Sequence, residues 1–257
     1  MSANLPVPLL EAKAVAKHFG GVKALRDVSL TIRRGEIYGL IGPNGAGKTT
    51  FFNCMTGLYV PDGGGFVFDG APLVADAPHR AAERGIARTF QNIRLFGNMT
   101  ALENVMVGRH VRTRAGVLGA MLNNAATKAE EAAIRQRAID LLHYVRIEDR
   151  ADDLAKNLSY GDQRRLEIAR ALATEPKLLC LDEPAAGMNA TETAELRELI
   201  EGIRRDGTTI LLIEHDVKLV MGLCDRVAVL DYGALVIEDV PAVVQKDQRV
   251  IEAYLGA

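Results

Sequence analysis

A glycine-rich segment at residues 42–49 constrains the fold of this chain more than any other part of the sequence. It reads Gly-Pro-Asn-Gly-Ala-Gly-Lys-Thr and follows a short apolar run at 36–41. A short apolar run that ends in glycine is typical of a buried strand. Residues 48–56 predict a helix, with Gly57 as its stop signal. The order of strand, glycine loop and helix is typical of α/β folds.

The same segment matches the P-loop pattern of glycine, four residues, glycine, lysine and Ser/Thr. Glycines let the backbone curl so that several N–H groups point at phosphate oxygens, and the helix adds the positive end of its dipole. We expect Lys48 to reach the β- and γ-phosphates, the Thr49 hydroxyl to ligate Mg²⁺, and Thr50 to add a phosphate contact. A glycine-rich turn without a ligand is the alternative, but it does not explain the strand before and the helix after. The predicted ATP-binding residues of the loop are Gly42, Pro43, Asn44, Gly45, Ala46, Gly47, Lys48, Thr49 and Thr50.

Two adjacent carboxylates follow a second apolar strand, which is predicted at 177–181. Asp182 and Glu183 stand directly after it. In a P-loop fold, the first carboxylate can hold Mg²⁺ through water, and the second can orient or deprotonate the attacking water. An exposed acidic turn is the alternative interpretation, and alone the pair would fit either. The P-loop upstream favours the catalytic interpretation.

The rest of the chain divides into a helical middle and α/β flanks. Between 92 and 158 there is little strand pattern, and one face of an amphipathic helix is predicted there by Ile134, Ala138, Leu141 and Val145. Strands are predicted at 9–14, 24–32, 66–68 and 208–213, with a turn at 61–65. Helices are predicted at 166–172 and at 191–205, the second with Asn189 as N-cap and Glu192 three residues on, and a hairpin at 227–237.

Residues 158–165 decide between the families that carry a P-loop. They read Leu-Ser-Tyr-Gly-Asp-Gln-Arg-Arg and stand before a predicted helix, just upstream of the acidic strand. This segment resembles the signature motif of ABC transporter ATPases, and the resemblance covers nearly the whole chain with the landmarks in the family's order. It implies an α/β P-loop NTPase fold of the ABC-cassette type, with a mixed sheet core, an antiparallel β part and a helical subdomain. The implied single domain spans 1–257, with the nucleotide-binding core at 1–91 and 159–257 and the helical insertion at about 92–158.

The resemblance also assigns roles to residues that would mean little alone. Phe19 matches the aromatic residue that stacks on adenine, for which a π-face is well suited; a core phenylalanine is the alternative. Gln91 matches the glutamine that senses Mg²⁺ and begins the path to the membrane subunit. His215, directly after an apolar strand, matches the switch histidine that contacts the γ-phosphate. Asp182 matches the magnesium-holding aspartate, and Glu183 matches the catalytic glutamate.

The signature segment implies a second subunit. Ser159 and Gly161 match the residues that bind the γ-phosphate of ATP held by the opposite subunit, so a complete site needs a second cassette. Three residues depart from the generic pattern: Tyr160 replaces glycine, Asp162 replaces glutamine, and Asn189 replaces aspartate. These departures bear on the contacts across the dimer and leave the nucleotide-binding role intact.

Four strings, at 88–96, 158–170, 183–189 and 250–256, look like the larger of two ATPase subunits in high-affinity branched-chain amino acid importers. This resemblance implies ATP and Mg²⁺ as cofactors and a different, related cassette as the other half of a heterodimer. It further implies two transmembrane permease subunits and, indirectly, a periplasmic protein that delivers leucine, isoleucine or valine. The chain would be a peripheral subunit at the cytoplasmic face of the inner membrane.

Three other functions are possible for a chain with a P-loop. An ATPase for lipopolysaccharide export also has a short cassette and a similar signature, but the strings around Phe90 and Asn189 favour the importer. Soluble ABC ATPases of DNA repair or translation usually carry two cassettes or a long coiled-coil insertion, whereas this chain has one cassette and no basic tail. A metabolic P-loop kinase would not explain residues 158–163.

Composition sets outer limits on the function. With 257 residues and 48% hydrophobic content, the chain can bury one domain, or a domain and a subdomain. A net charge of −2 gives no overall field for nucleic acid, and we expect no nucleic-acid partner. Cys54, Cys180 and Cys224 are odd in number and without paired spacing, which predicts small buried side chains in a reducing compartment. We expect no signal peptide in residues 1–10 and no transmembrane segment, so a partner would hold the chain at a membrane.

Overall fold

The computed structural model describes residues 7–74, 77–109 and 125–255, in a chain that divides into two compact units. Unit 1 comprises residues 1–88 and 177–257, and unit 2 comprises residues 89–176. Unit 2 is therefore wider than the insertion expected at 92–158. Helix α6 (Tyr160–Leu172) begins inside the signature segment, earlier than the predicted helix at 166–172. It was expected in the core but packs against the helices of unit 2.

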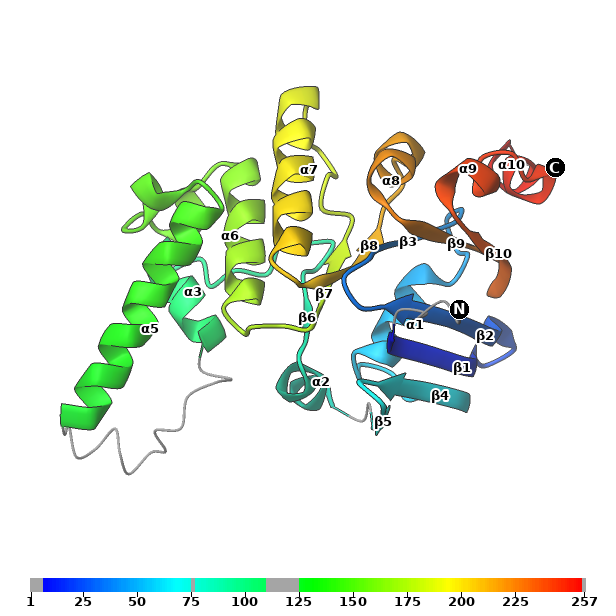
Figure 1. The fold of residues 1–257 in the computed structure, drawn as a ribbon, viewed down its shortest axis with the longest axis horizontal. Coiled ribbons are helices and arrows are strands. Elements are labelled where there is room, and N and C mark those ends of the chain that lie inside the picture. The colour runs from blue at the N-terminus through cyan, green and yellow to red at the C-terminus, as the bar shows by residue number, and fades with distance from the viewer. Residues whose placement is uncertain (1–6, 75–76, 110–124, 256–257) are drawn as a thin grey trace, which may run out of the picture. The chain divides into compact units, whose positions relative to one another are not determined.

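Unit 1 contains two sheets (Figure 1). The antiparallel sheet has the order β2-β1-β4-β5, formed by β1 (Pro8–Phe19), β2 (Val22–Arg33), β4 (Gly63–Phe68) and β5 (Ala71–Leu73). The second sheet has the order β10-β9-β3-β8-β7-β6, formed by β3 (Ile37–Ile41), β6 (Ile86–Arg88), β7 (Leu178–Asp182), β8 (Thr209–Ile213), β9 (Arg226–Asp231) and β10 (Ala234–Asp239). Its strands are parallel except for β10, which runs antiparallel to β9. The prediction of a mixed sheet with an antiparallel part is confirmed.

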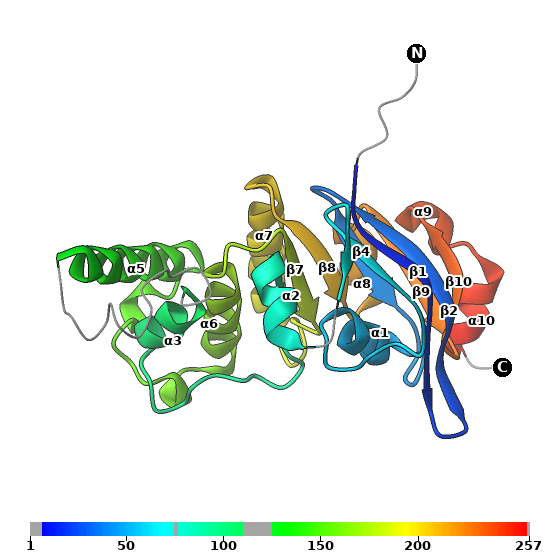
Figure 2. The ribbon, with the colours of Figure 1, turned by 90° about the horizontal axis from the view of Figure 1, so that it is seen from below.

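One helix of unit 1 fills the space between the two sheets. This helix is α1 (Lys48–Met55), which lies between the sheets in Figure 2. Its Phe51 and Phe52 belong to an apolar cluster that also holds side chains from both sheets. On the opposite face of the six-stranded sheet lie α7 (Ala190–Arg205) and α8 (Val217–Leu223) (Figure 1). The remaining helices of unit 1 are α2 (Pro78–Arg84), α9 (Pro241–Val244) and α10 (Gln248–Leu255).

Burial explains the strongest sequence signals. All five residues of β3, of β7 and of β8 are buried, which is why these strands are apolar except for Asp182 at the end of β7 and Thr209 at the start of β8. At the start of α7, the Asn189 side chain accepts bonds from the N–H groups of Thr191 and Glu192, and Glu192 accepts a bond from the Asn189 N–H. The predicted capping box is therefore confirmed.

The glycines at 63–65 were predicted as part of a turn, and this prediction is wrong because they belong to β4. Gly64 has a φ of 66°, and a Cβ there would lie 2.1 Å from the Ala14 carbonyl oxygen. Glycine at this position allows a neighbouring strand to come close. The short elements β5, α2 and β6 were not predicted, because three to seven residues carry too little periodicity.

The described part of unit 2 is helical. It consists of α3 (Ala101–Arg109), α5 (Ala125–Tyr144), two 3₁₀ turns at Glu148–Arg150 and Ala155–Asn157, and α6. Of the four residues predicted on one helix face, Ala138, Leu141 and Val145 are buried and Ile134 is half-buried. Among the helices described in either unit, none combines the length and the apolar character that crossing a membrane requires.

Candidate functional site

The glycine-rich loop after β3 is held by backbone approaches that exclude side chains. A Cβ on Gly42 would lie 2.1 Å from the Leu230 carbonyl oxygen, and one on Gly47 would lie 2.6 Å from the Ala24 carbonyl oxygen. Both glycines have positive φ, 151° and 103°. Gly233, in the β9–β10 turn, donates its N–H to the Ala46 carbonyl at 3.0 Å. The loop therefore rests on the hairpin that follows far later in the sequence.

Lys48 lies over this loop. It is buried, and its Nζ donates to the carbonyl oxygens of Gly42 (2.5 Å) and Pro43 (3.0 Å). Burial lowers the pKa of the Lys48 ammonium, and the negative charges of Glu183 and Asp182 oppose this shift. A cation in this position, beside a helix N-terminus whose N-cap Gly47 offers no side-chain acceptor, suits an anionic phosphate chain.

The carboxylates after β7 meet the histidine after β8. The two strands are parallel neighbours, with Asp182 opposite Ile213 in the register, so the residues that follow them lie at the same edge. Glu183 has a φ of 49°, in the left-handed region, and its Oε1 lies 2.7 Å from Nε2 of His215. Strained backbone at a side chain with such a contact is common in catalytic sites.

A buried glutamate fixes the two segments that carry these residues. Glu214 is 3% exposed and accepts bonds from the N–H groups of Ala185 (2.7 Å) and His215 (3.1 Å). Burial raises the pKa of Glu214, and these backbone bonds oppose the shift. It joins the segment after Glu183 to the segment of His215.

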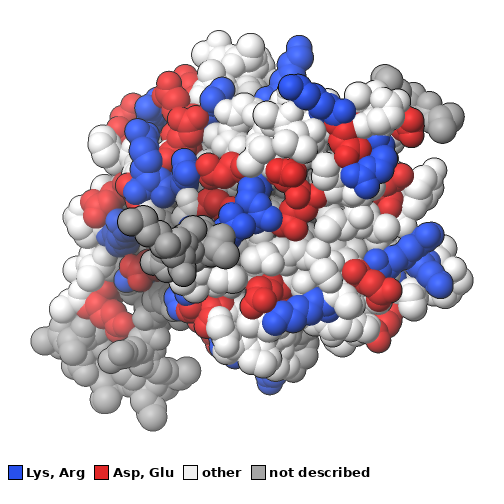
Figure 3. Space-filling view, turned by 45° about the vertical axis from the view of Figure 1, so that its right-hand side comes forward, with Lys and Arg blue, Asp and Glu red and all other residues white. Residues whose placement is uncertain are grey.

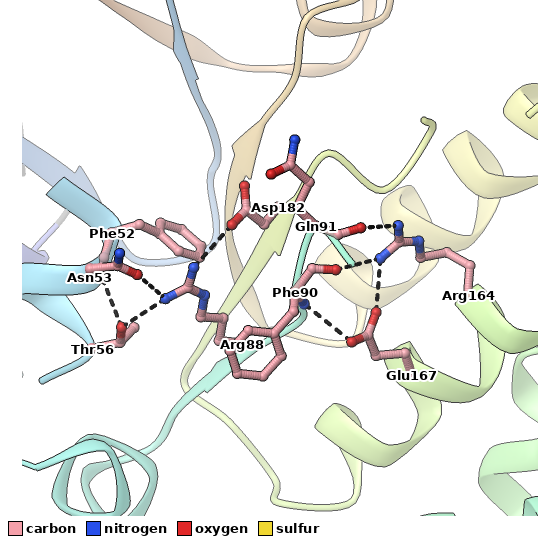
Figure 4. A network of polar contacts seen from close by, with 9 residues as sticks. All are labelled: Phe52, Asn53, Thr56, Arg88, Phe90, Gln91, Arg164, Glu167 and Asp182. Carbon is pink, nitrogen blue, oxygen red and sulfur yellow. Dashed lines mark hydrogen bonds and ion pairs between the residues drawn. The ribbon is translucent and has the colours of Figure 1, made fainter. Parts of the chain in front are cut away.

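Asp182 is paired with an arginine. Its Oδ2 lies 3.0 Å from Nη2 of Arg88, the last residue of β6, and both side chains are nearly fully buried (Figure 4). Removing one partner of such a buried pair is costly, because it leaves the other charge in a poorly solvated place.

Phe19, at the end of β1, is 44% exposed and presents an aromatic surface. Its ring stands edge-on to Tyr59, with ring centroids 5.2 Å apart, and Lys17 Nζ lies 5.5 Å from its centroid. It is thus not a core phenylalanine.

In unit 2, the signature segment forms the N-terminus of α6. Ser159 is its N-cap: Oγ accepts the Asp162 N–H and donates to Asp162 Oδ2 at 2.7 Å. The Tyr160 hydroxyl accepts a bond from Nη2 of Arg164 at 3.1 Å. Tyr160 and Asp162, two of the departures from the generic signature, therefore have hydrogen-bond partners in α6 or at its N-cap. Gly161 lies between them in the sequence.

Gln91 also lies in unit 2, in a segment whose backbone is held by an ion pair of α6 (Figure 4). Arg164 donates to the carbonyl oxygens of Phe90 (2.7 Å) and Gln91 (2.9 Å), while Glu167 accepts the Phe90 N–H (3.2 Å). Arg164 and Glu167 are 2.8 Å apart, and both side chains are fully buried.

Residues 25–186 match the family model described as ABC transporter. The chain belongs to the ABC transporter ATP-binding family. The cassette is 46% identical to the high-affinity branched-chain amino acid transport ATP-binding protein LivG of Salmonella typhimurium, over 97% of this chain and 98% of that protein. It is 34% identical to the lipopolysaccharide export system ATP-binding protein LptB of Escherichia coli, over 96% and 97%.

Solved structures agree with this family. A nucleotide-free ATP-binding cassette from an ABC transporter matches with a TM-score of 0.85 and 30% identity, over 98% of this chain and all of that one. A dimeric bacterial ABC transporter cassette matches with a TM-score of 0.77 and 27% identity, over 90% and 98%. The predictions of the family, of the P-loop fold and of an ATP-binding, ATP-hydrolysing cassette are thereby confirmed.

The predicted site residues are divided between the two units. Unit 1 carries Phe19, the loop at 42–50, Asp182, Glu183 and His215, and unit 2 carries Gln91, Ser159 and Gly161. Their individual roles remain predictions. The cassette offers hard oxygen donors of the kind that Mg²⁺ prefers, in the Asp182 carboxylate and the exposed Thr49 hydroxyl. Among the described residues, no group of three or more His, Cys, Asp or Glu could hold a metal ion by itself, and Mg²⁺ beside phosphates usually needs only one or two carboxylates.

Sequence reasoning missed Arg88, Glu214 and the pair of Arg164 and Glu167. Arg88, Glu214 and Glu167 stand inside or directly beside apolar runs, which is the signal that could have identified them. Arg164 stands between Gln163 and Arg165 and carries no such signal. On the face shown in Figure 3, Lys and Arg side chains are interspersed with Asp and Glu side chains. The expectation that the protein has no nucleic-acid partner stays a prediction.

Proposed function

We propose that the cassette binds ATP with Mg²⁺ and hydrolyses it to power uptake of branched-chain amino acids. The difference in identity to two relatives carries this proposal. The chain is 46% identical to the branched-chain amino acid protein and 34% identical to the lipopolysaccharide export protein, at nearly equal coverage. In this proposal the membrane subunits choose the transported amino acid, and the cassette supplies the energy of ATP hydrolysis.

In this proposal, unit 1 is the nucleotide-binding core. Phe19 stacks on adenine, the backbone of 42–47 with Lys48 and Thr50 holds the phosphates, and Thr49 and Asp182 hold Mg²⁺. By the family resemblance, Gln91 of unit 2 is a further candidate metal ligand. When bound, Mg²⁺ neutralises charge on the β- and γ-phosphate oxygens. Glu183 orients and deprotonates water, and its 2.7 Å contact with His215 brings that imidazole beside the same centre, where it stabilises charge on the γ-phosphate.

Glu183→Gln tests this assignment. The variant should bind ATP as the wild type does and lose turnover by a factor of about 10² to 10⁴, the usual contribution of a general base. The assay compares nucleotide affinity and phosphate release on the same preparation, and wild-type release rates would contradict the role of Glu183.

The cassette works in this proposal as half of a dimer. Each chain carries one P-loop and one signature segment, so Ser159 and Gly161 serve the ATP of a second, related cassette, and the complete pair is a heterodimer. ATP binding closes the pair and hydrolysis reopens it. The movement reaches two transmembrane permease subunits through unit 2 and the segment of Gln91. A periplasmic amino-acid-binding protein supplies the substrate, and the cassette lies at the cytoplasmic face of the inner membrane.

Co-purification from detergent-solubilised membranes, followed by mass spectrometry, tests the partners. Recovery of two permeases and a second cassette of the branched-chain type, with leucine-stimulated ATPase activity after reconstitution with the binding protein, is the expected result. Recovery of lipopolysaccharide-export components would favour the second candidate, which the 34% identical relative supports. A chain recovered without any membrane protein would refute both.

A further inference from the structure

We propose that Arg88 is the positioning residue of the metal-binding carboxylate: it holds Asp182 in place, and Mg²⁺-dependent nucleotide binding depends on it. The inference rests on the proposed assignment of Asp182 to Mg²⁺. It concerns a residue outside the P-loop, the acidic pair and the signature segment.

The first observation is that Arg88 is itself held firmly. Its Nη1 donates to Oδ1 of Asn53 at 2.6 Å and to Oγ1 of Thr56 at 3.2 Å, and its guanidinium lies 4.5 Å from the centroid of the Phe52 ring (Figure 4). All three partners belong to α1 or to the residue directly after it. Since α1 begins at Lys48, the helix that opens at the phosphate loop also fixes the guanidinium.

The second observation is the burial of the ion pair. The side chains of Arg88 and Asp182 are 10% and 4% exposed, and the 3.0 Å bond between Nη2 and Oδ2 is charge-assisted. Exposed ion pairs contribute little, whereas breaking a buried one leaves a charge without solvent or counterion. Without Arg88, the carboxylate of Asp182 would lose a charge-assisted bond that orients it and a positive charge 3.0 Å away.

The third observation is the geometry that arginine alone provides. One guanidinium reaches Asp182 through Nη2 and α1 through Nη1, and its flat face packs on Phe52. A lysine ammonium keeps the charge but has neither the fork nor the flat face. Groups that orient a metal ligand in this manner typically change metal affinity by about 10- to 100-fold when removed.

The test measures binding of a fluorescent ATP analogue to the purified full chain, with Mg²⁺ and with EDTA. The ratio of the two dissociation constants is the gain in affinity that the metal provides. Arg88→Met should lower this gain by about 10- to 100-fold and leave the affinity in EDTA unchanged. Arg88→Lys should fall between Arg88→Met and the wild type. Electron paramagnetic resonance of Mn²⁺ with ATP gives the same comparison without relying on turnover.

A matched control separates positioning from general loosening. Arg226 in β9 is also a largely buried arginine, paired with Glu238 at 2.5 Å and 5.5 Å from the Tyr38 ring centroid. Arg226 is the first residue of β9, whereas Asp182 is the last residue of β7. Because β9 and β7 run in the same direction, the two residues lie at opposite ends of the strands. Arg226→Met should leave the metal-dependent gain unchanged. An equal loss in both variants, or an equal loss in EDTA and in Mg²⁺, would overturn the proposal.

Asp182→Asn distinguishes a failure of the assignment of Asp182 to Mg²⁺ from a failure of the role of Arg88. If Asp182→Asn leaves the gain unchanged, the assignment of Asp182 to Mg²⁺ fails, and the role of Arg88 with it. If Asp182→Asn removes the gain but Arg88→Met does not, only the role of Arg88 is overturned. The double variant should show no further loss beyond Asp182→Asn. Should Arg88→Met fail to fold by circular dichroism, Arg88→Lys decides by the same ratio.

Discussion

The fully buried pair of Arg164 and Glu167 gives a sharp prediction for stability. Glu167→Gln keeps the volume of the side chain but removes the charge that balances Arg164 at 2.8 Å. Leaving one charge of a buried pair uncompensated lowers the free energy of unfolding by about 3–5 kcal/mol. With a urea m-value of about 2–3 kcal/mol/M, the midpoint should fall by about 1–2.5 M. Far-ultraviolet circular dichroism is the probe, because the chain contains no tryptophan.

The chain provides a matched control on a surface helix. Arg197 and Glu201 of α7 form the same type of pair at 3.1 Å, with side chains 48% and 44% exposed. Glu201→Gln should lower the free energy of unfolding by less than about 1 kcal/mol. Equal effects of Glu201→Gln and Glu167→Gln would refute the argument from burial.

A double variant tests why the buried pair is present. Replacing both charges by apolar residues is often harmless elsewhere. In Arg164→Met/Glu167→Leu, however, the bonds to the Phe90 N–H and to the carbonyl oxygens of Phe90 and Gln91 are also lost. At about 1 kcal/mol for each bond, the double variant should stay about 3 kcal/mol less stable than the wild type. If the double variant is as stable as the wild type, the pair of Arg164 and Glu167 does not stabilise the backbone of Phe90 and Gln91.

Three further predictions concern local structure. Gly42→Ala should lower the free energy of unfolding by about 2–4 kcal/mol in thermal melts, because its Cβ would clash with the Leu230 carbonyl. Gly45→Ala is the control: Gly45 has a φ of 81° and open space around it, so the same melts should show a loss of only about 1–2 kcal/mol. Asn189→Ala should remove the capping box of α7 and lower the free energy of unfolding by about 1 kcal/mol in urea. The three buried cysteines should react with a thiol reagent only after unfolding, since burial raises the pKa of each, to about 11 for Cys54; fast labelling of the native chain would contradict the burial.

The sequence predicted the site well where the functional residues and the residues that shape the local backbone stand in one short segment. The loop at 42–49 needs glycines for its own backbone, and Asp182 and Glu183 directly follow an apolar strand, so both patterns are visible within ten residues. Asn189 and Glu192 are likewise a short-range signal. The roles of residues such as Gln91 came from the resemblance, since no local pattern distinguishes one glutamine from another.

Long-range contacts were beyond the reach of sequence patterns. Arg88 stands 94 positions from Asp182, and nothing near either residue indicates the other. Leu230 and Gly233 support a loop about 190 residues earlier, and no periodicity reports such an approach. Glycines 63–65 were misjudged for a related reason: a close neighbouring strand and a turn favour the same residue type.

The position of β3 in its sheet has a consequence for how the chain folds as it is synthesised. Its two neighbours, β8 and β9, both lie beyond residue 186, where the match to the family model ends. Ile37 pairs with a residue that leaves the ribosome about 170 positions later, a delay of about 10–30 s at usual rates of synthesis. The antiparallel strands β1, β2 and β4 can pair during that interval. During synthesis, β3 therefore stays unpaired, and its apolar side chains have no sheet in which to pack until most of the protein has been made.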